Sequence, residues 1–290
     1  MDARFPAVDG VEHRFVDVGG LHVHVAEAGA GEPVLMLHGW PQHWYMWRRI
    51  VPLLAPHHRL IMPDMRGFGW TSVPSGGYDK ETLATDAIRL LDALGLERVR
   101  LMGHDWGGWA AFLACLRAPE RFSHYVALNV PPPWPRVSPR TAKGLGKFWY
   151  QAVVATPLLG RRLLSSRFAE RIVTVDLVHP EAIGAAEARA YTDRLKGGRG
   201  RASELLYRTF LLREMGPLVA GRYDSQRLTV PTRLLFGERD FAIAPALVTG
   251  HEHRADDLEV ELVPDSGHFI AEEKPELVAE RALAFFAAEV

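Results

Sequence analysis

The arrangement of apolar and polar residues changes after the first 30 positions of the chain. Residues 21–25, LHVHV, alternate in the manner of a half-buried strand, and Gly19 and Gly20 predict a hairpin turn that joins this strand to an earlier one. Continuous apolar runs then follow, as expected for strands covered on both faces, at 33–37, 59–62, 99–102 and 125–128.

Helical periodicity fills the spaces between these runs. Asp79 is a plausible N-cap for a helix that places Leu83, Ala87, Leu90, Leu91 and Leu94 on one face, and Gly95 can end it in a left-handed conformation. Because strands and helices alternate along the chain, we expect a mostly parallel sheet flanked by helices, an α/β fold.

The alternation stops after Asn129. Residues 131–140, PPPWPRVSPR, form a proline-rich boundary, and the chain to about residue 224 is largely helical. Strand patterns return at 232–236 and 258–263, and a last helix begins near Pro275. The sequence therefore predicts a core formed by 1–130 and 226–290, with a helical cap inserted at 131–225. Within the cap, KGGRGR at 196–201 lacks a preceding strand, so we expect a solvated basic loop rather than a phosphate site.

Composition narrows the class of protein. The chain has 290 residues, 48% of them apolar, and 34 basic against 35 acidic side chains, so its net charge of -1 favours neither nucleic acid nor an anionic membrane as partner. The single cysteine, Cys115, is expected to be buried. The first 18 residues carry early charge and no unbroken apolar segment, which predicts neither a signal peptide nor a membrane span and favours a cytoplasmic protein.

The stretch 103–108, GHDWGG, carries the candidate chemistry. An apolar strand precedes Gly103 and helical residues follow Gly107, so Asp105 occupies the centre of a sharp strand-to-helix turn where hydrolases normally carry serine. The alternative is that Asp105 only caps the following helix.

Several motifs together give the chain a resemblance to a known family. They are GHDWGG and, in addition, HGWP at 38–41, DMRGFGWT at 64–71, GERD at 237–240 and SGHF at 266–269. Over almost its full length the chain resembles an α/β-hydrolase and, within that superfamily, an epoxide hydrolase. An aspartate suits this chemistry, because attack on a saturated carbon by serine would leave an ether, whereas a carboxylate leaves an ester that water can cleave.

The second step needs a base that activates water. His268 follows the late strand in a glycine-bearing loop, as the catalytic histidine of the superfamily does, and Asp240 follows the strand at 232–236 and would orient the imidazole. Asp265 is nearer to His268 in sequence but is equally explained as a turn residue. Asn129 occupies the position where some relatives carry the acid, and asparagine cannot supply the charge.

The resemblance also implies residues that bind the substrate. The backbone N–H groups of Trp40 and Trp106 would form an oxyanion hole, and a cis bond is expected before Pro41. Two cap tyrosines, Tyr150 and Tyr207, would hydrogen-bond the epoxide oxygen, although either could be a core residue, as Tyr191 is expected to be. The substrate pocket is expected to include His38, Pro41 and Trp109, while His38 and His104 also support their turns.

Other functions remain open. A haloalkane dehalogenase would use the same aspartate, with Trp106 donating to halide, but it typically has a polar residue where this chain has Trp40. A fluoroacetate dehalogenase would have arginines near 106 and 109, an esterase would need the missing serine, and a non-enzymatic ligand-binding relative would be expected to have lost the triad. Eight tryptophans favour an aromatic-walled pocket and an apolar substrate. The resemblance implies that this substrate is a small apolar epoxide, with water as co-substrate in a detoxification reaction. We expect no cofactor and no metal, and a monomer or homodimer.

Overall fold

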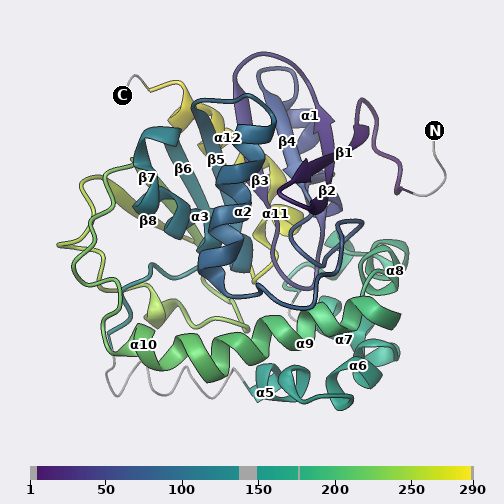
Figure 1. Ribbon diagram of the computed structural model, residues 1–290. Coiled ribbons are helices and arrows are strands. Elements are labelled where there is room, and N and C mark those ends of the chain that lie inside the picture. The colour runs from purple at the N-terminus through teal and green to yellow at the C-terminus, as the bar shows by residue number, and fades with distance from the viewer. Residues whose placement is uncertain (1–4, 137–148, 176, 289–290) are drawn as a thin grey trace.

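The computed structural model contains a central sheet of eight strands, and describes residues 5–136, 149–175 and 177–288. The strand order is β1-β2-β4-β3-β5-β6-β7-β8, and among these strands only β2 runs against its neighbours (Figure 1). The strands are β1 Glu12–Val18, β2 Leu21–Ala28, β3 Pro33–Leu37, β4 Arg59–Pro63, β5 Val99–His104, β6 Phe122–Leu128, β7 Thr232–Gly237 and β8 Leu258–Val263. The expected mostly parallel α/β sheet is confirmed.

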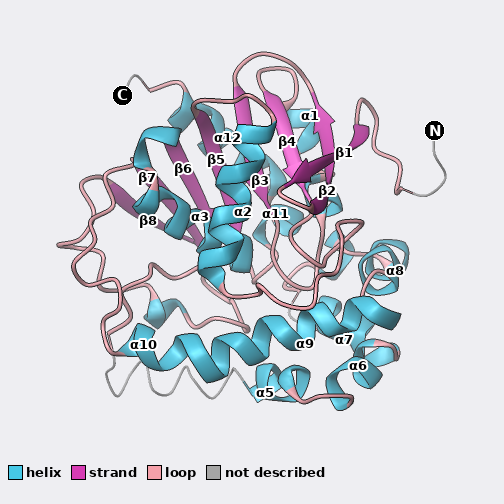
Figure 2. Ribbon diagram, viewed as in Figure 1, coloured by secondary structure: helices cyan, strands magenta, loops and turns pink. Residues whose placement is uncertain are grey.

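Helices cover both faces of this sheet (Figure 2). On one face, α2 Lys80–Ala93 packs against α3 Asp105–Arg117, and their apolar side chains join one core cluster. On the other face, α12 Pro275–Phe286 packs with α1 Val51–Leu54 and α11 Ile270–Glu273 in a second cluster. Cys115 lies buried in α3, as expected.

The predicted turn and helix signals are present in the structure. Gly19 and Gly20 have φ values of +60° and +87°, as the turn between β1 and β2 requires. The Asp79 side chain accepts a hydrogen bond from the Thr82 N–H at the start of α2, and Gly95 follows this helix with φ +67°.

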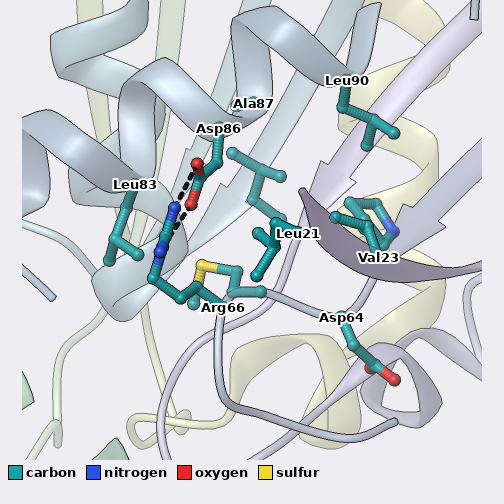
Figure 3. Close-up of a pocket in the computed structure, with 11 residues that line it drawn as sticks. Leu21, Val23, Asp64, Arg66, Leu83, Asp86, Ala87 and Leu90 are labelled. Carbon is teal, nitrogen blue, oxygen red and sulfur yellow. Dashed lines mark hydrogen bonds and ion pairs between the residues drawn. The ribbon is translucent and has the colours of Figure 1, made fainter. Parts of the chain in front are cut away.

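The loop after β4 is tied to α2 by an ion pair. Arg66 donates from Nε and Nη2 to the two carboxylate oxygens of Asp86, both at 2.7 Å, beside an apolar contact between Leu21, Val23 and Leu83 (Figure 3). A two-bond arginine–carboxylate contact of this kind restricts both side chains. The pair therefore holds the loop in register with the helix.

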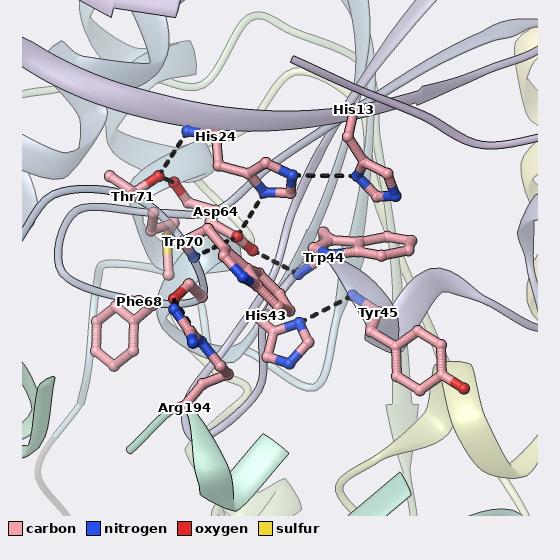
Figure 4. Close-up of polar contacts among 12 residues, drawn as sticks. His13, His24, His43, Trp44, Tyr45, Asp64, Phe68, Trp70, Thr71 and Arg194 are labelled. Carbon is pink, nitrogen blue, oxygen red and sulfur yellow. Dashed lines mark hydrogen bonds and ion pairs between the residues drawn. The ribbon is translucent and has the colours of Figure 1, made fainter. Parts of the chain in front are cut away.

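A buried carboxylate, Asp64, organises the same loop from its other side (Figure 4). Its oxygens lie 2.7 Å from His24 Nδ1 and accept hydrogen bonds from the Trp44 and Trp70 N–H groups, both at 2.9 Å. Burial alone would raise the pKa of Asp64, but His24 and the more distant His43 hold it well below its usual range. The ionised group therefore joins three segments of the core.

The described residues between β6 and β7 are largely helical, and their helices lie together along one end of the sheet (Figure 1). They form α5 Trp149–Ala155, α6 Leu159–Leu164, α7 Arg167–Thr174, α8 Ala185–Asp193, α9 Gly200–Thr209, the π-helix η6 Phe210–Glu214 and α10 Met215–Val219. We refer to α5–α10 with η6 as the lid. The exact limits of the predicted cap remain a prediction, and residues 137–140 of its proline-rich boundary lie outside the described residues.

The prediction of a solvated loop at 196–201 is correct for exposure and wrong for conformation, because Lys196, Gly197, Gly198 and Arg201 are exposed but the segment is helical. Gly197–Arg199 forms a single helical turn, and Gly200 begins α9. Arg199 Nη1 donates to the Thr71 carbonyl at 2.8 Å, and the nearby Arg194 donates to the Gly69 carbonyl. These arginines bind carbonyl groups of the loop after β4, so this exposed part of the lid is also fastened to the core. Among the described residues, no helix is long and apolar enough to span a bilayer.

Candidate active site

Asp105 stands at the turn between β5 and α3 with a φ of +49°. Among residues with a side chain, few other than asparagine and aspartate adopt this left-handed conformation. The conformation costs free energy and is kept only where the surrounding structure enforces it. Here the strand ends at His104 and the helix begins at Asp105 itself, so the side chain projects from the apex of the turn.

The neighbouring glycines explain why this turn can form. A Cβ on Gly107 would lie 2.2 Å from the His38 carbonyl oxygen, and a Cβ on Gly39 would lie 2.5 Å from Cβ of Asp105. Both distances are far inside van der Waals contact, and the obstruction at Gly107 is backbone that cannot rotate away. The glycines therefore let the turn approach the loop after β3 closely enough for hydrogen bonding.

That loop donates directly to the aspartate. The Trp40 N–H binds Asp105 Oδ2 at 2.9 Å, and the Trp106 N–H also donates to this carboxylate. The Trp40–Pro41 bond is cis, as expected. Burial raises the pKa of Asp105 to about 6, and the nearby His268 and the two N–H groups limit the rise. Asp105 is therefore ionised at neutral pH while remaining poorly hydrated.

His268 lies between the two aspartates. Its Nδ1 is 2.9 Å from Asp240 Oδ2, and because a carboxylate accepts, Nδ1 carries the proton and Nε2 is left as an acceptor. Nε2 lies 4.0 Å from Asp105 Oδ1, too long for a hydrogen bond. Asp240 is buried and its Oδ1 also accepts from the Ile243 N–H at 2.7 Å, so the carboxylate cannot turn away.

Asp265 does not take part in this arrangement. It has a φ of +52° in the turn after β8, and its half-exposed carboxylate pairs with His179 and Arg239. The structure thus brings together Asp105, Asp240 and His268 from the ends of three different parallel strands. Their catalytic roles remain a prediction that this geometry supports.

Other polar residues fix the triad in place. Asn129 is fully buried, and its Nδ2 donates both to Asp240 Oδ2 at 2.8 Å and to the Gly267 carbonyl at 3.1 Å. His104 Nε2 donates to the His268 carbonyl at 2.8 Å, and Glu273 accepts from the Gly267 N–H. The residue type at Asn129 indicated only that no acid stands there, and no pattern in the sequence indicated a role for Glu273. The signal available for Asn129 was its position at a strand end, where its φ is +46°.

The two cap tyrosines meet beside the aspartate. Their rings pack edge to face with centroids 5.9 Å apart, and both contact the indole of Trp40, whose Nε1 donates to Ser203 Oγ in α9. Burial raises the pKa of Tyr150 and of Tyr207 well above the usual range, and the charge of Asp105 raises both further. Both phenols therefore keep their protons at neutral pH. Tyr191 is buried away from this group, against Glu272 and Arg48, as a core residue.

A cavity of about 440 Å³ opens beside His268. Its wall is predominantly apolar and includes one face of α7, where Phe168, Ile172 and Val175 recur at helical spacing, together with Tyr150 and Phe241. A volume of this size suits a small organic molecule.

Only one of the three predicted pocket residues lines this cavity. Pro41 lines the cavity, whereas His38 and Trp109 are not among its lining residues. His38 is fully buried, with Nε2 accepting from the Met65 N–H and Nδ1 near the Gly39 carbonyl, so it supports the turn. Trp109 packs on Phe210 from within α3. Sequence reasoning missed the α7 face and Phe241, because their apolar side chains look like ordinary core residues.

The fold and this site define the class of protein. A family model for the alpha/beta hydrolase fold matches residues 32–275, and the chain belongs to this family. Within it, the chain is similar to epoxide hydrolases and also has haloalkane dehalogenases among its relatives.

Three comparisons support that statement. The chain is 31% identical to the soluble epoxide hydrolase of Corynebacterium sp. (strain C12), over 96% of this chain and 98% of that protein. It is 29% identical to haloalkane dehalogenase 2 of Mycobacterium bovis, over 97% of each. The solved structure of the epoxide hydrolase CorEH without ligand matches with a TM-score of 0.77 and 30% identity, covering 96% of this chain and 99% of that one.

Proposed function

We propose that the protein hydrolyses an apolar epoxide to a vicinal diol through an ester on Asp105. One observation carries the proposal: the two oxygens of this carboxylate have different surroundings. Oδ2 accepts from the Trp40 N–H at 2.9 Å, whereas Oδ1 faces His268 Nε2 at 4.0 Å. The carboxylate thus has one oxygen for attack and one that already accepts from a backbone N–H of the kind an oxyanion needs.

In the first step, Asp105 Oδ1 attacks a ring carbon of the epoxide and the carbon–oxygen bond of the ring breaks. The electron pair stays on the epoxide oxygen, which takes a proton from Tyr150 or Tyr207. Because burial raises the pKa of both phenols, the resulting tyrosinate is a strong base that readily recovers a proton later in the cycle. The product of this step is an alkyl ester of Asp105.

In the second step, His268 Nε2 takes a proton from water, and the hydroxide attacks Cγ of the ester. Negative charge develops on Oδ2, where the Trp40 N–H stabilises it, and the Trp106 N–H donates to the same carboxyl group. Asp240 stabilises the imidazolium through Nδ1. When the ester bond breaks, the diol oxygen takes the proton from His268, and the proton on Asp105 returns to the tyrosinate, so one epoxide and one water give one diol.

The ester is the feature to test. We expect His268→Gln, incubated with styrene oxide, to accumulate one covalent adduct per chain on Asp105, seen by intact-protein and peptide mass spectrometry. His268→Gln combined with Asp105→Ala should form none. Wild-type enzyme in heavy-oxygen water should carry label in Asp105 after one turnover. Diol formation without adduct or label would refute the ester route.

Parallel incubation with 1-bromobutane separates the alternatives. Bromide release without diol formation from epoxides would identify a haloalkane dehalogenase. Binding of either compound without any product would identify a ligand-binding relative instead. We expect diol release to dominate, because two protonated phenols, one buried and one partly buried, stand beside Asp105.

The phenols themselves can be tested by removing single oxygens. Tyr207→Phe and Tyr150→Phe should each lower kcat for epoxides by about 10²-fold or more, because the developing alkoxide loses a donor. Tyr191→Phe is the matched control, since Tyr191 lies against Glu272 and outside the site. Unchanged kcat in both single variants and in the double variant would refute the assignment of these donors.

A further inference from the structure

Lys80 is a buried cation that the reaction described above does not use. It is the first residue of α2 and is only 1% exposed. Its Nζ donates to Glu214 Oε2 at 2.8 Å and to the Leu206 carbonyl at 3.2 Å. Its backbone N–H donates to the other oxygen of Glu214, also at 2.8 Å. Glu214 belongs to the π-helix of the lid, so this pair joins the core to the lid.

The same ammonium also touches residues of the proposed site. Nζ lies 4.4 Å from the centre of the Trp106 ring and 5.1 Å from that of Phe210. Trp106 is the residue that follows Asp105 and donates to it, and Leu206 directly precedes Tyr207. One side chain therefore contacts the neighbours of the carboxylate and of a proposed proton donor.

The lid helix changes its hydrogen-bond pattern at this point. The α-helical pattern of α9 ends at Thr209, and the π-helix η6 follows at Phe210–Glu214. Such π-helical insertions occur often at functional sites. The Phe210 N–H still points to the carbonyls of Leu206 and Tyr207, and Lys80 supplies a second donor to Leu206. The ammonium thus ties down the turn that carries the Tyr207 ring.

Burying a charged side chain costs free energy that apolar packing between the lid and the core would not. Burial lowers the pKa of Lys80, and Glu214, Asp79 and Asp105 act against this change. Replacing a buried ion pair by apolar residues of similar volume is often neutral or stabilising, so fastening alone does not require the charge. The ammonium lies over the ring of Trp106, the residue next to Asp105, and Asp105 is among the groups that interact with it, which suggests a different use.

We propose, on the basis of the function proposed above, that Lys80 is a positioning residue that fixes Trp106 and the Leu206–Tyr207 turn and supplies positive charge near Asp105. Asp105 is also faced by His268 and Asp240 from the strand ends and by Tyr150 and Tyr207 from the lid. Of these groups, only His268 can carry a positive charge. Lys80 therefore adds a second cationic group, paired with Glu214, to a site whose nucleophile must stay ionised.

Two substitutions distinguish this role from simple fastening, because they break the same pair from opposite sides. Lys80→Met removes the cation and leaves Glu214, whereas Glu214→Gln removes the anion and leaves Lys80. The measurement is the pH midpoint at which the infrared carboxyl band of Asp105 appears, identified by difference from Asp105→Asn. It needs no substrate, so it remains interpretable if the protein proves inactive on epoxides.

We expect the midpoint to rise by about half a pH unit or more in Lys80→Met and to fall in Glu214→Gln, because loss of a nearby cation disfavours the ionised carboxylate and loss of a nearby anion favours it. Lys80→Arg should restore the wild-type value at least in part. Lys196→Met, which removes an exposed lysine of the lid, should change nothing. Shifts of the same sign in the two variants, or no shift in either although both fold, would overturn the proposal.

Turnover gives a second readout if epoxides are substrates. Lys80→Met should lower kcat by about 10- to 100-fold, as small misplacements of reacting groups do, with KM little changed because Lys80 does not line the cavity. An unchanged kcat with normal thermal stability would overturn the positioning role. Inactivity of the wild-type enzyme on epoxides would instead refute the function proposed above. The infrared measurement would still test the charge effect, because it needs no substrate.

Discussion

Asp105 should destabilise the folded protein in the ionised form that the proposed reaction needs. The substitution Asp105→Asn keeps the shape of the side chain and an oxygen that accepts from the Trp40 N–H, but removes the charge. Burial raises the pKa of this carboxyl from its ordinary value of 3.8 to about 6. A difference of that size corresponds to about 3 kcal/mol of folding free energy.

The sign of the effect follows from proton binding. Between about pH 4 and pH 6, folded Asp105 keeps a proton that the unfolded chain has released, so the free energy of unfolding falls as pH rises through this window. Above this pH window, the buried ionised carboxylate lowers the free energy of unfolding by the full amount. Asp105→Asn has no such step, so we expect the variant to be more stable than wild type by up to about 3 kcal/mol at pH 8, and equal to it near pH 4.

Urea unfolding at a series of pH values measures this difference directly. The exposed Asp9 provides a matched control, because Asp9→Asn changes the same functional group outside the core. Turnover should be lost in Asp105→Asn and kept in Asp9→Asn. A stability difference that does not vary with pH, or a variant less stable than wild type at pH 8, would refute the link between burial and charge.

Three other expectations concern pH dependence, packing and a buried ion pair. For epoxides, kcat/KM should fall below about pH 6 because protonated Asp105 does not attack, and a flat profile between pH 5 and pH 8 would contradict this. Gly107→Ala should cost more than about 4 kcal/mol in thermal unfolding because its Cβ would meet the His38 backbone, while Gly216→Ala, with open space around it in α10, should be neutral or stabilising. Asp64→Asn should cost about 3–5 kcal/mol, since His24 loses its buried partner; a loss under about 1 kcal/mol would argue against the ion pair.

Local chemistry explains which features could be predicted from the sequence. The apolar runs at 33–37 and 99–102 are strands because backbone pairing inside a doubly covered sheet needs apolar side chains on both faces. Asp79 caps α2 through a contact three residues away. Asp105 stands in its turn because the nearby glycines permit it. Each of these depends mainly on neighbours in the chain, so spacing and residue type were sufficient.

The site itself depends on residues that are far apart in the chain. Only the tertiary structure decides that His268 Nδ1 lies 2.9 Å from Asp240 and its Nε2 4.0 Å from Asp105, because these three loops meet only when the parallel strands align. Burial, and with it the raised pKa of Asp105, is likewise a property of the assembled core and lid. His38 shows the limit of motif reasoning: its sequence position is next to the pocket, but packing directs its ring into the turn.

The same reason accounts for Lys80 and for the wall of the cavity. A lysine at a helix start is normally solvated, and nothing in its sequence neighbourhood indicates a lid carboxylate 134 positions later. The apolar residues on one face of α7 have helical spacing, which predicts that this face is covered. The spacing does not predict that the face lines a cavity. The sequence thus determined most of the secondary structure and the position of the proposed nucleophile, through short-range sterics and hydrophobic periodicity. Distances, charge states and pocket shape came only from the packing of distant segments, which no local pattern encodes.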